Sequence, residues 1–163
     1  MPVDELLHAI ASRYERVRSG LDVGFGDEEV SRALHESRGG VWRTIGDEAE
    51  FPFEDAQFEV VVMDGAKVTR GSVREANRVL RPDGCLFFTV PERTRRQQGL
   101  TPQEVYRLIR EGFSILSVDR PAWWKFGRGG RTLTVCARKK AWREHKSLFH
   151  GGAAPYNLFR SMT

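Results

Sequence analysis

The sequence has few of the residues on which small disulfide-bonded or metal-binding proteins depend. Its 163 residues include two cysteines and four histidines, and the histidines are scattered along the chain. Neither a disulfide framework nor a zinc site fits that pattern. Cys85 and Cys136 each lie inside an expected strand, so we predict reduced thiols that pack as small apolar side chains. Reduced cysteines favour a cytoplasmic setting.

Long hydrophobic runs are also missing. No apolar stretch approaches the ~20 residues that a membrane-spanning helix needs. The opening MPVDELLHAI holds two acids and no lysine or arginine, unlike a signal peptide. Hydrophobic residues make up 40% and charged residues 29% of the chain, which is typical of a globular domain and too apolar for a disordered one. We therefore expect a soluble protein with no membrane partner.

The charges are unevenly distributed. The net charge is +4, yet the stretch from Asp47 to Glu59 contains six acids and no bases. From Lys125 to Lys146 there are eight bases and one acid. The sequence thus predicts an acidic region and a basic C-terminal third that favours polyanions.

Hydrophobic periodicity predicts an alternation of helices and strands. The expected helices cover 3–18, 27–36, 69–80 and 101–112. The expected strands end at residue 23 or cover 41–45, 58–63, 85–90, 113–119 and 131–139, with a turn at 81–84. Alternation of this kind predicts an α/β fold with a mostly parallel sheet covered by helices on both faces. The final pair of strands predicts an antiparallel C-terminal strand.

Two glycines mark the first strand-to-helix junction. Gly24 and Gly26 follow Asp22 where the first strand ends. Glycines there let the backbone approach a ligand, and the helix N-terminus offers free N–H groups. A tight turn without a ligand would explain these glycines equally well.

Three segments in order resemble the class I S-adenosylmethionine-dependent methyltransferases. They are DVGFG (22–26), GDEAEFPFEDAQFEVVVMD (46–64) and REANRVLRPDGCLFFTVP (74–91). That family carries a D-x-G-x-G loop, a stretch like GDAEDLPF before its fourth strand and a helix–turn like E-x-x-R-V-L-K-P-G-G before its fifth. The resemblance covers residues 20–140 and implies a Rossmann-like methyltransferase fold that uses S-adenosylmethionine as cofactor.

The resemblance also implies a cofactor site. Gly24 and Gly26 would pack under the methionine part of the cofactor. Asp22 would hold either the loop or the amino group of the cofactor, and Met63 and Asp64 would face its sulfonium. The implied cofactor-binding residues are Asp22, Gly24, Phe25, Gly26, Asp47, Glu48, Met63 and Asp64. No catalytic residue is implied, because methyl transfer is largely a matter of positioning.

The chain departs from the family in two ways. Glu28 stands where a third glycine is usual, and a strand–helix unit at the sheet edge is missing before the acidic loop. We expect 41–45 to serve as the second strand and to run directly into that loop. Asp47 then follows Asp22 by 25 positions, near the ~20-residue offset of ribose-binding acids. Glu48 and Phe51 would be adenine contacts, unless the acids only solvate a loop.

The residues that could contact the methyl acceptor are less clearly marked in the sequence. Glu92 follows the fifth expected strand and either faces an acceptor or is solvated. Two loops mix basic and aromatic residues: Arg93, Arg95, Arg96, Trp123, Trp124, Lys125, Arg128 and Arg131. This mixture suits RNA as a partner, although tryptophans that cover the sheet edge and solvated arginines would give the same pattern.

Two domain-level expectations follow. Residues 1–140 form the methyltransferase-like domain, and 141–163 form an ordered C-terminal extension, because its aromatic content is too high for a free tail. It would fold back, cover the exposed edge or dock on a partner. The expected function is methyl transfer to RNA or a small molecule. The alternative is a non-catalytic module that contacts RNA or a protein, and a nicotinamide-dependent oxidoreductase fits less well.

Overall fold

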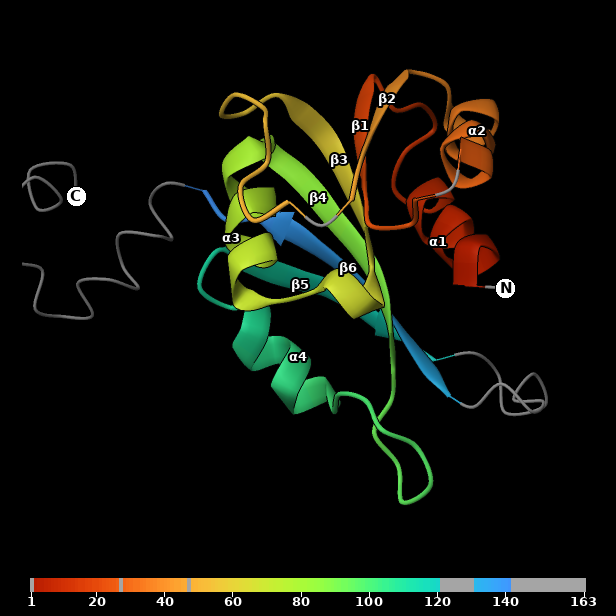
Figure 1. The fold of residues 1–163 in the computed structure, drawn as a ribbon, viewed down its shortest axis with the longest axis vertical. Helices are drawn as coiled ribbons and strands as arrows, with labels where there is room; N and C mark the ends of the chain where they lie inside the picture. Colours follow the sequence, from red (N-terminus) through yellow and green to blue (C-terminus); the bar gives the residue numbers. More distant parts are fainter. Residues whose placement is uncertain (1, 27, 47, 121–130, 142–163) are drawn as a thin grey trace, which may run out of the picture.

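A six-stranded sheet lies between two layers of helices (Figure 1). The computed structural model describes residues 2–26, 28–46, 48–120 and 131–141. The helices are α1 (Pro2–Ala11), α2 (Glu28–Arg38), η1 (Gly65–Lys67, a 3-10 turn), α3 (Arg70–Val79) and α4 (Pro102–Ile109). The strands are β1 (Ser19–Val23), β2 (Val41–Ile45), β3 (Phe58–Asp64), β4 (Leu80–Pro91), β5 (Phe113–Asp119) and β6 (Thr132–Lys139). None of the described helices is both long and apolar enough to cross a membrane.

The strand order is β2-β1-β3-β4-β6-β5. Strands β1 to β4 pair in parallel, whereas β6 runs antiparallel to both β4 and β5. This topology confirms the predicted parallel sheet with an antiparallel C-terminal strand. It also places Val41–Ile45 beside β1 at the edge of the sheet, as expected of a fold that lacks its outer strand–helix unit.

Two hydrophobic cores cover the two faces of the sheet. Helices α3 and α4 pack on one face against a cluster that includes Val61, Leu86 and Val135. Helices α1 and α2 pack on the other against a cluster that includes Val62 and Phe87. Because side chains of a strand alternate between faces, the apolar run of β3 fills both cores. The second core also holds the two buried, unpaired thiols, as the sequence predicted.

Capping explains why α3 and α4 begin where they do. Thr69 accepts a hydrogen bond from the backbone N–H of Ser72, whose side chain bonds back to Thr69. Thr101 and Glu104 form the same reciprocal pair at α4, where Pro102 occupies the first turn. Such boxes satisfy two otherwise free N–H groups, so both starts follow from local sequence.

Helix α1 is shorter than predicted. It ends at Ala11 rather than at residue 18. The apolar Val17 belongs to the next segment, where its N–H donates to the carbonyl of Arg38 at the end of α2 (3.0 Å) and its side chain joins the second core. Val17 is therefore apolar because it is buried in the second core, and its spacing from the apolar residues of α1 matches a helix only by coincidence.

The predicted turn at 81–84 lies within strand β4. Leu80 pairs with Phe58 and Cys85 with Val60, so the two strands pair on both sides of an irregularity in register. Asp83 has a φ of 63° there, which aspartate tolerates better than most residues. The Pro-Asp-Gly signal therefore marks a bulge in a long strand.

Candidate functional site

The strand order reverses between β1 and β3, so the carboxyl ends of these two strands form the topological switch point of the sheet. These neighbours are followed by α2 and α3, which lie on opposite faces of the sheet. Ligands of open α/β sheets bind outside the carboxyl ends of strands at such a point. In this protein the switch point lies between the glycine loop after Val23 and the end of β3 at Asp64, which makes it the candidate crevice.

The glycine loop has a backbone that few other residues could adopt. Gly24 and Gly26 have φ values of 87° and 62°. The N–H of Gly24 donates to the carbonyl of Ile45 (2.8 Å), which ties the loop to β2. A β-carbon on Gly24 would collide with Cγ of Lys67, whereas one on Gly26 would meet no atom within 4 Å. The loop is thus covered by Lys67 at Gly24 and open at Gly26.

Asp22 lies beneath this loop. Its side chain is fully buried, and Oδ2 accepts a hydrogen bond from the hydroxyl of Ser31 on α2 (3.0 Å). The Ser31 hydroxyl is also bonded to that of Thr44 on β2. The carboxylate therefore links β1, α2 and β2, which fits the loop-holding role rather than contact with a ligand. Phe25 is half-buried and packs against the second core.

The end of β3 places two of the expected residues differently. Met63 is fully buried in the first core, on the side of α3 and α4. Asp64 is half-buried, and its Oδ1 accepts from the N–H of Ala66 (3.1 Å) to cap η1. A β-carbon on Gly65 would collide with the carbonyl of Thr89, so this glycine allows β3 and β4 to lie close together.

A polar row extends from the crevice across the sheet. Asp64 is in register with Thr89 on β4, and Thr89 with Thr134 on β6. The hydroxyls of Thr132 and Thr134 both donate to Oε2 of Glu5 on α1 (3.2 Å each). The row therefore reaches from the end of β3 to helix α1. We call Glu5, Asp64, Thr89 and Thr134 the polar row.

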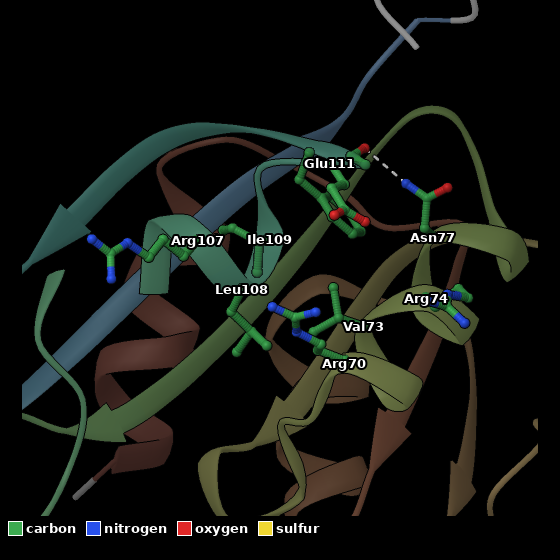
Figure 2. Close-up of a pocket in the computed structure, with 10 residues that line it drawn as sticks. Arg70, Val73, Arg74, Asn77, Arg107, Leu108, Ile109 and Glu111 are labelled. Carbon is green, nitrogen blue, oxygen red and sulfur yellow. Dashed lines mark hydrogen bonds between the residues drawn. The ribbon is translucent and has the colours of Figure 1, made fainter. Parts of the chain in front are cut away.

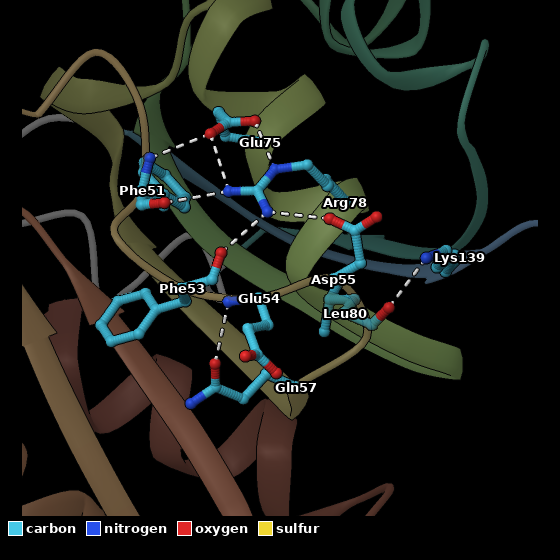
Figure 3. Close-up of polar contacts among 9 residues, drawn as sticks. All are labelled: Phe51, Phe53, Glu54, Asp55, Gln57, Glu75, Arg78, Leu80 and Lys139. Atoms are coloured by element: carbon cyan, nitrogen blue, oxygen red, sulfur yellow. Dashed lines mark hydrogen bonds and ion pairs between the residues drawn. The ribbon is translucent and has the colours of Figure 1, made fainter.

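The described part of the acidic loop between β2 and β3 contains no helix, and Arg78 of α3 fixes its shape (Figure 3). The guanidinium donates to the carbonyls of Phe51 (2.9 Å) and Phe53 (2.8 Å). It also bonds Glu75 through Nε (2.9 Å) and Asp55 through Nη1 (2.9 Å). Hydrogen bonding from Arg78 lowers the pKa of Glu75. The loop and α3 thus form one rigid wall of the site.

The residues expected to contact the adenine and ribose of the cofactor differ in their exposure along this loop. Phe51 is 3% exposed and belongs to the first core, so its ring is not free to stack on an adenine. Glu48 is exposed. Asp47 lies outside the described residues, and so does the side chain of Glu28, the first residue of α2.

Glu92 is neither solvated nor free. It is 7% exposed, and Arg120 donates to it from Nε (3.0 and 3.1 Å) and Nη2 (2.7 Å). The hydrogen bonds and charge of Arg120 hold the pKa of Glu92 below its usual range. A carboxylate held in this way is a poor proton acceptor for catalysis.

The basic residues expected to contact RNA differ in their surroundings. Arg93 is engaged, since it donates to Glu104 (2.7 Å), while Arg95 and Arg96 are exposed. The basic and aromatic residues at 123–128 and the extension from 142 onward lie outside the described residues.

Sequence reasoning did not identify the polar row or Lys67. Glu5 and Thr134 are 129 positions apart and meet only through the packing of α1 on β6. A weak signal was present, because threonines interrupt otherwise apolar strands at positions 89, 132 and 134.

No family model matches the sequence, and no curated protein matches it significantly. Solved structures do match. The 1,6-didemethyltoxoflavin-N1-methyltransferase of Burkholderia thailandensis, with bound S-adenosylhomocysteine, is 20% identical (TM-score 0.64), over 86% of this chain and 77% of that one.

Two further structures show the breadth of the fold. The N-methyltransferase NodS of Bradyrhizobium japonicum, also bound to S-adenosylhomocysteine, is 14% identical (TM-score 0.65), over 85% of this chain and 86% of that one. The cyclase SpnF is 17% identical (TM-score 0.65), over 85% of this chain and 81% of that one. At such identities the likeness speaks for the fold alone. This chain has the Rossmann-like fold of the class I S-adenosylmethionine-dependent methyltransferases.

Proposed function

We propose that this protein binds S-adenosylmethionine in the crevice between β1 and β3 and transfers its methyl group to an acceptor. The observation that carries the proposal is the glycine loop. Gly24 and Gly26 have left-handed backbones above a fully buried Asp22, at the point where the sheet order reverses. When bound, S-adenosylmethionine supplies an electrophilic methyl group on a sulfonium.

The residues around the crevice suit the charges of this cofactor. Lys67 lies against Gly24 and brings a cation to the place where a methionine carboxylate would be held. Asp64 lies at the end of β3, across the proposed crevice from the glycine loop, and its carboxylate would attract a positively charged sulfonium or ammonium. We assign the ribose hydroxyls to Asp47 and the adenine side to Glu48.

The acceptor would be held along the polar row. Thr89 and Thr134 supply hydroxyls and Glu5 a carboxylate, which together orient an amine or hydroxyl group on a small molecule or on RNA. Glu92 is excluded from this task by its ion pair with Arg120. In this proposal the protein works in the cytoplasm, and the exposed Arg95 and Arg96 would contact the phosphates of an RNA acceptor.

One observation favours the alternative of a non-catalytic binding module. The side chain of Lys67 lies directly over Gly24 and narrows the crevice where the cofactor would enter. For binding to occur, that flexible side chain has to rotate toward the ligand carboxylate. A chain in which Lys67 stays in place would keep the fold without the chemistry.

Calorimetry with S-adenosylmethionine and S-adenosylhomocysteine tests the proposal. We expect saturable binding, and we expect Asp47→Ala to weaken it at least several-fold, since a ribose loses its acceptor pair. Glu54→Ala, an exposed acid in the same loop, serves as the matched control and should bind like wild type. Absence of both heat and thermal shift at millimolar ligand would favour the binding module instead.

A further inference from the structure

A cavity lies on the face of the sheet opposite α1 and α2. It has a volume of about 250 Å³ and lies between α3 and the C-terminal half of α4 (Figure 2). Its floor is apolar and consists of Val73, Leu108, Ile109 and Phe113. None of the eight residues expected at the cofactor crevice lines it.

The walls of this cavity are fixed. Asn77 of α3 donates from Nδ2 to the carbonyl of Gly112, just after α4 (2.8 Å). A β-carbon on Gly112 would lie 2.7 Å from that same amide nitrogen. The hydrogen bond links the two helices at this end, and a side chain at position 112 would force the Asn77 amide to shift. The cavity is therefore preformed, as small-molecule sites usually are.

The rim of the cavity is basic. Arg70 and Arg74 on α3 and Arg107 on α4 line it, with Glu111 as the only carboxylate among the lining residues. Within the described part of the chain, none of these three guanidinium groups has a hydrogen bond or ion pair. By contrast, Arg78, one turn beyond Arg74, is fully engaged with Glu75, Asp55 and two carbonyls.

The orientation of the arginines indicates where an anion would bind. Figure 2 shows the guanidinium of Arg70 turned toward the Leu108 side of the cavity, while that of Arg107 points away from it. Both side chains are exposed, so Arg107 rotates without disturbing the core. Arg70 is thus the primary anion contact, and Arg74 and Arg107 add positive charge around it.

We propose that this cavity binds a small organic anion: an acidic head group, carboxylate or phosphate ester, on one apolar ring or short chain. The apolar part packs on Val73, Ile109 and Phe113, and the head group bonds Arg70. The volume lies just below the ~300 Å³ at which most ligand pockets begin, so it suits a single ring system. Inorganic phosphate alone would leave the apolar floor uncovered.

Titration of the full chain with 3-phenylpropionate and with phenyl phosphate, followed by amide NMR shifts and calorimetry, tests this inference. We expect shifts at residues of α3 and α4 and about tenfold weaker binding of the neutral analogue 3-phenylpropanol, because it lacks the charge-assisted hydrogen bonds. Stronger binding of either anion supports the site and identifies its head group. Equal binding of the alcohol, or shifts confined to the glycine loop, would overturn the proposal.

Matched variants separate this site from general electrostatics. Arg70→Gln/Arg74→Gln should weaken anion binding about tenfold, and Leu108→Trp should block it by filling the cavity without changing the charge. Arg32→Gln/Arg43→Gln has the same net charge, changes exposed residues of α2 and β2, and should bind like wild type. An equal loss in this control would show that the anion responds to net charge only. S-adenosylmethionine takes no part in these measurements, so they are independent of the proposed methyl transfer.

Discussion

Arg120 donates to the carboxylate of Glu92 through both Nε and Nη2, with the shortest contact at 2.7 Å. This ion pair joins the end of β4 to the end of β5, since Glu92 and Arg120 directly follow these strands. It holds these two strand ends together, and its carboxylate is not a free base.

The ion pair predicts a specific pH dependence of stability. Hydrogen bonding from Arg120 lowers the pKa of Glu92 in the folded state, so the unfolded chain binds the proton more readily. The stabilisation is complete above the unfolded pKa of about 4.3 and is lost as pH falls through the lower folded value. In Glu92→Gln, chemical denaturation should show a free energy of unfolding that declines less between about pH 5 and pH 3 than in wild type.

Arg120→Gln should also reduce the decline of the free energy of unfolding between about pH 5 and pH 3, because it removes the cation that lowers the pKa of Glu92. Since Arg120 is 53% exposed, solvent screening limits the loss at neutral pH to about 1 kcal/mol. If both variants keep the wild-type slope, the pair does not control the acid sensitivity.

A matched pair of glycine variants tests the crevice. Gly26 and Gly39 have similar φ values of 62° and 71°, and a β-carbon at either meets nothing within 4 Å. Asparagine tolerates this backbone region. Gly26→Asn should therefore fold but place a side chain in the crevice, with binding of S-adenosylmethionine reduced at least tenfold by calorimetry. Gly39→Asn, at the end of α2, should bind normally, and equal losses in both would argue against a site at the loop.

Arg78 is expected to determine the stability of the acidic loop. Arg78→Gln leaves the carbonyl of Phe53 without the Arg78 donor, removes one of the two donors to the carbonyl of Phe51, and leaves Glu75 without its counter-charge. We expect a loss of about 2–3 kcal/mol in the free energy of unfolding, measured by urea denaturation. Arg32→Gln, on the exposed side of α2, should change it by no more than about 0.5 kcal/mol. A small effect of Arg78→Gln would mean that the loop holds its shape through Phe51 alone.

Gly20 and Trp42 should be energetically coupled. The indole ring occupies the space that a β-carbon on Gly20 would need, and its Nε1 donates to the carbonyl of Gly39 (2.9 Å). Gly20→Ala should destabilise the protein by about 1–3 kcal/mol through overpacking. In a Trp42→Leu background the same change should cost much less. Additive effects in this double-mutant cycle would contradict the contact.

Local sequence patterns predicted an element correctly where a single local interaction determines it. The strand at 41–45 followed from its strand-like sequence VWRTI, and the start of α4 at Thr101-Pro102 followed from capping chemistry. The end of α1 was wrong, because Val17 is buried by contact with the distant α2 and sheet rather than by helical periodicity. Periodicity records burial, and burial has more than one cause.

The candidate site was predictable only in part. The glycine loop follows from residues adjacent in sequence, and its left-handed backbones agree with that expectation. Phe51 was expected to face a ligand, but Arg78, 27 positions away, draws the loop onto the core and buries the ring. Similarly, the partner of Glu92 is 28 positions away in sequence. Such contacts depend on tertiary packing, which no spacing rule contains.

The hydrogen bond from the N–H of Gly24 to the carbonyl of Ile45 couples the outermost strand to the proposed cofactor site. Among the described strands β2 pairs with β1 alone, so fraying of β2 removes the anchor of the loop. A ligand that binds only while the loop is anchored would therefore oppose the fraying of β2, and fraying of β2 would weaken binding of the ligand. A ligand in the crevice would slow deuterium uptake at residues 41–45, although it touches none of them.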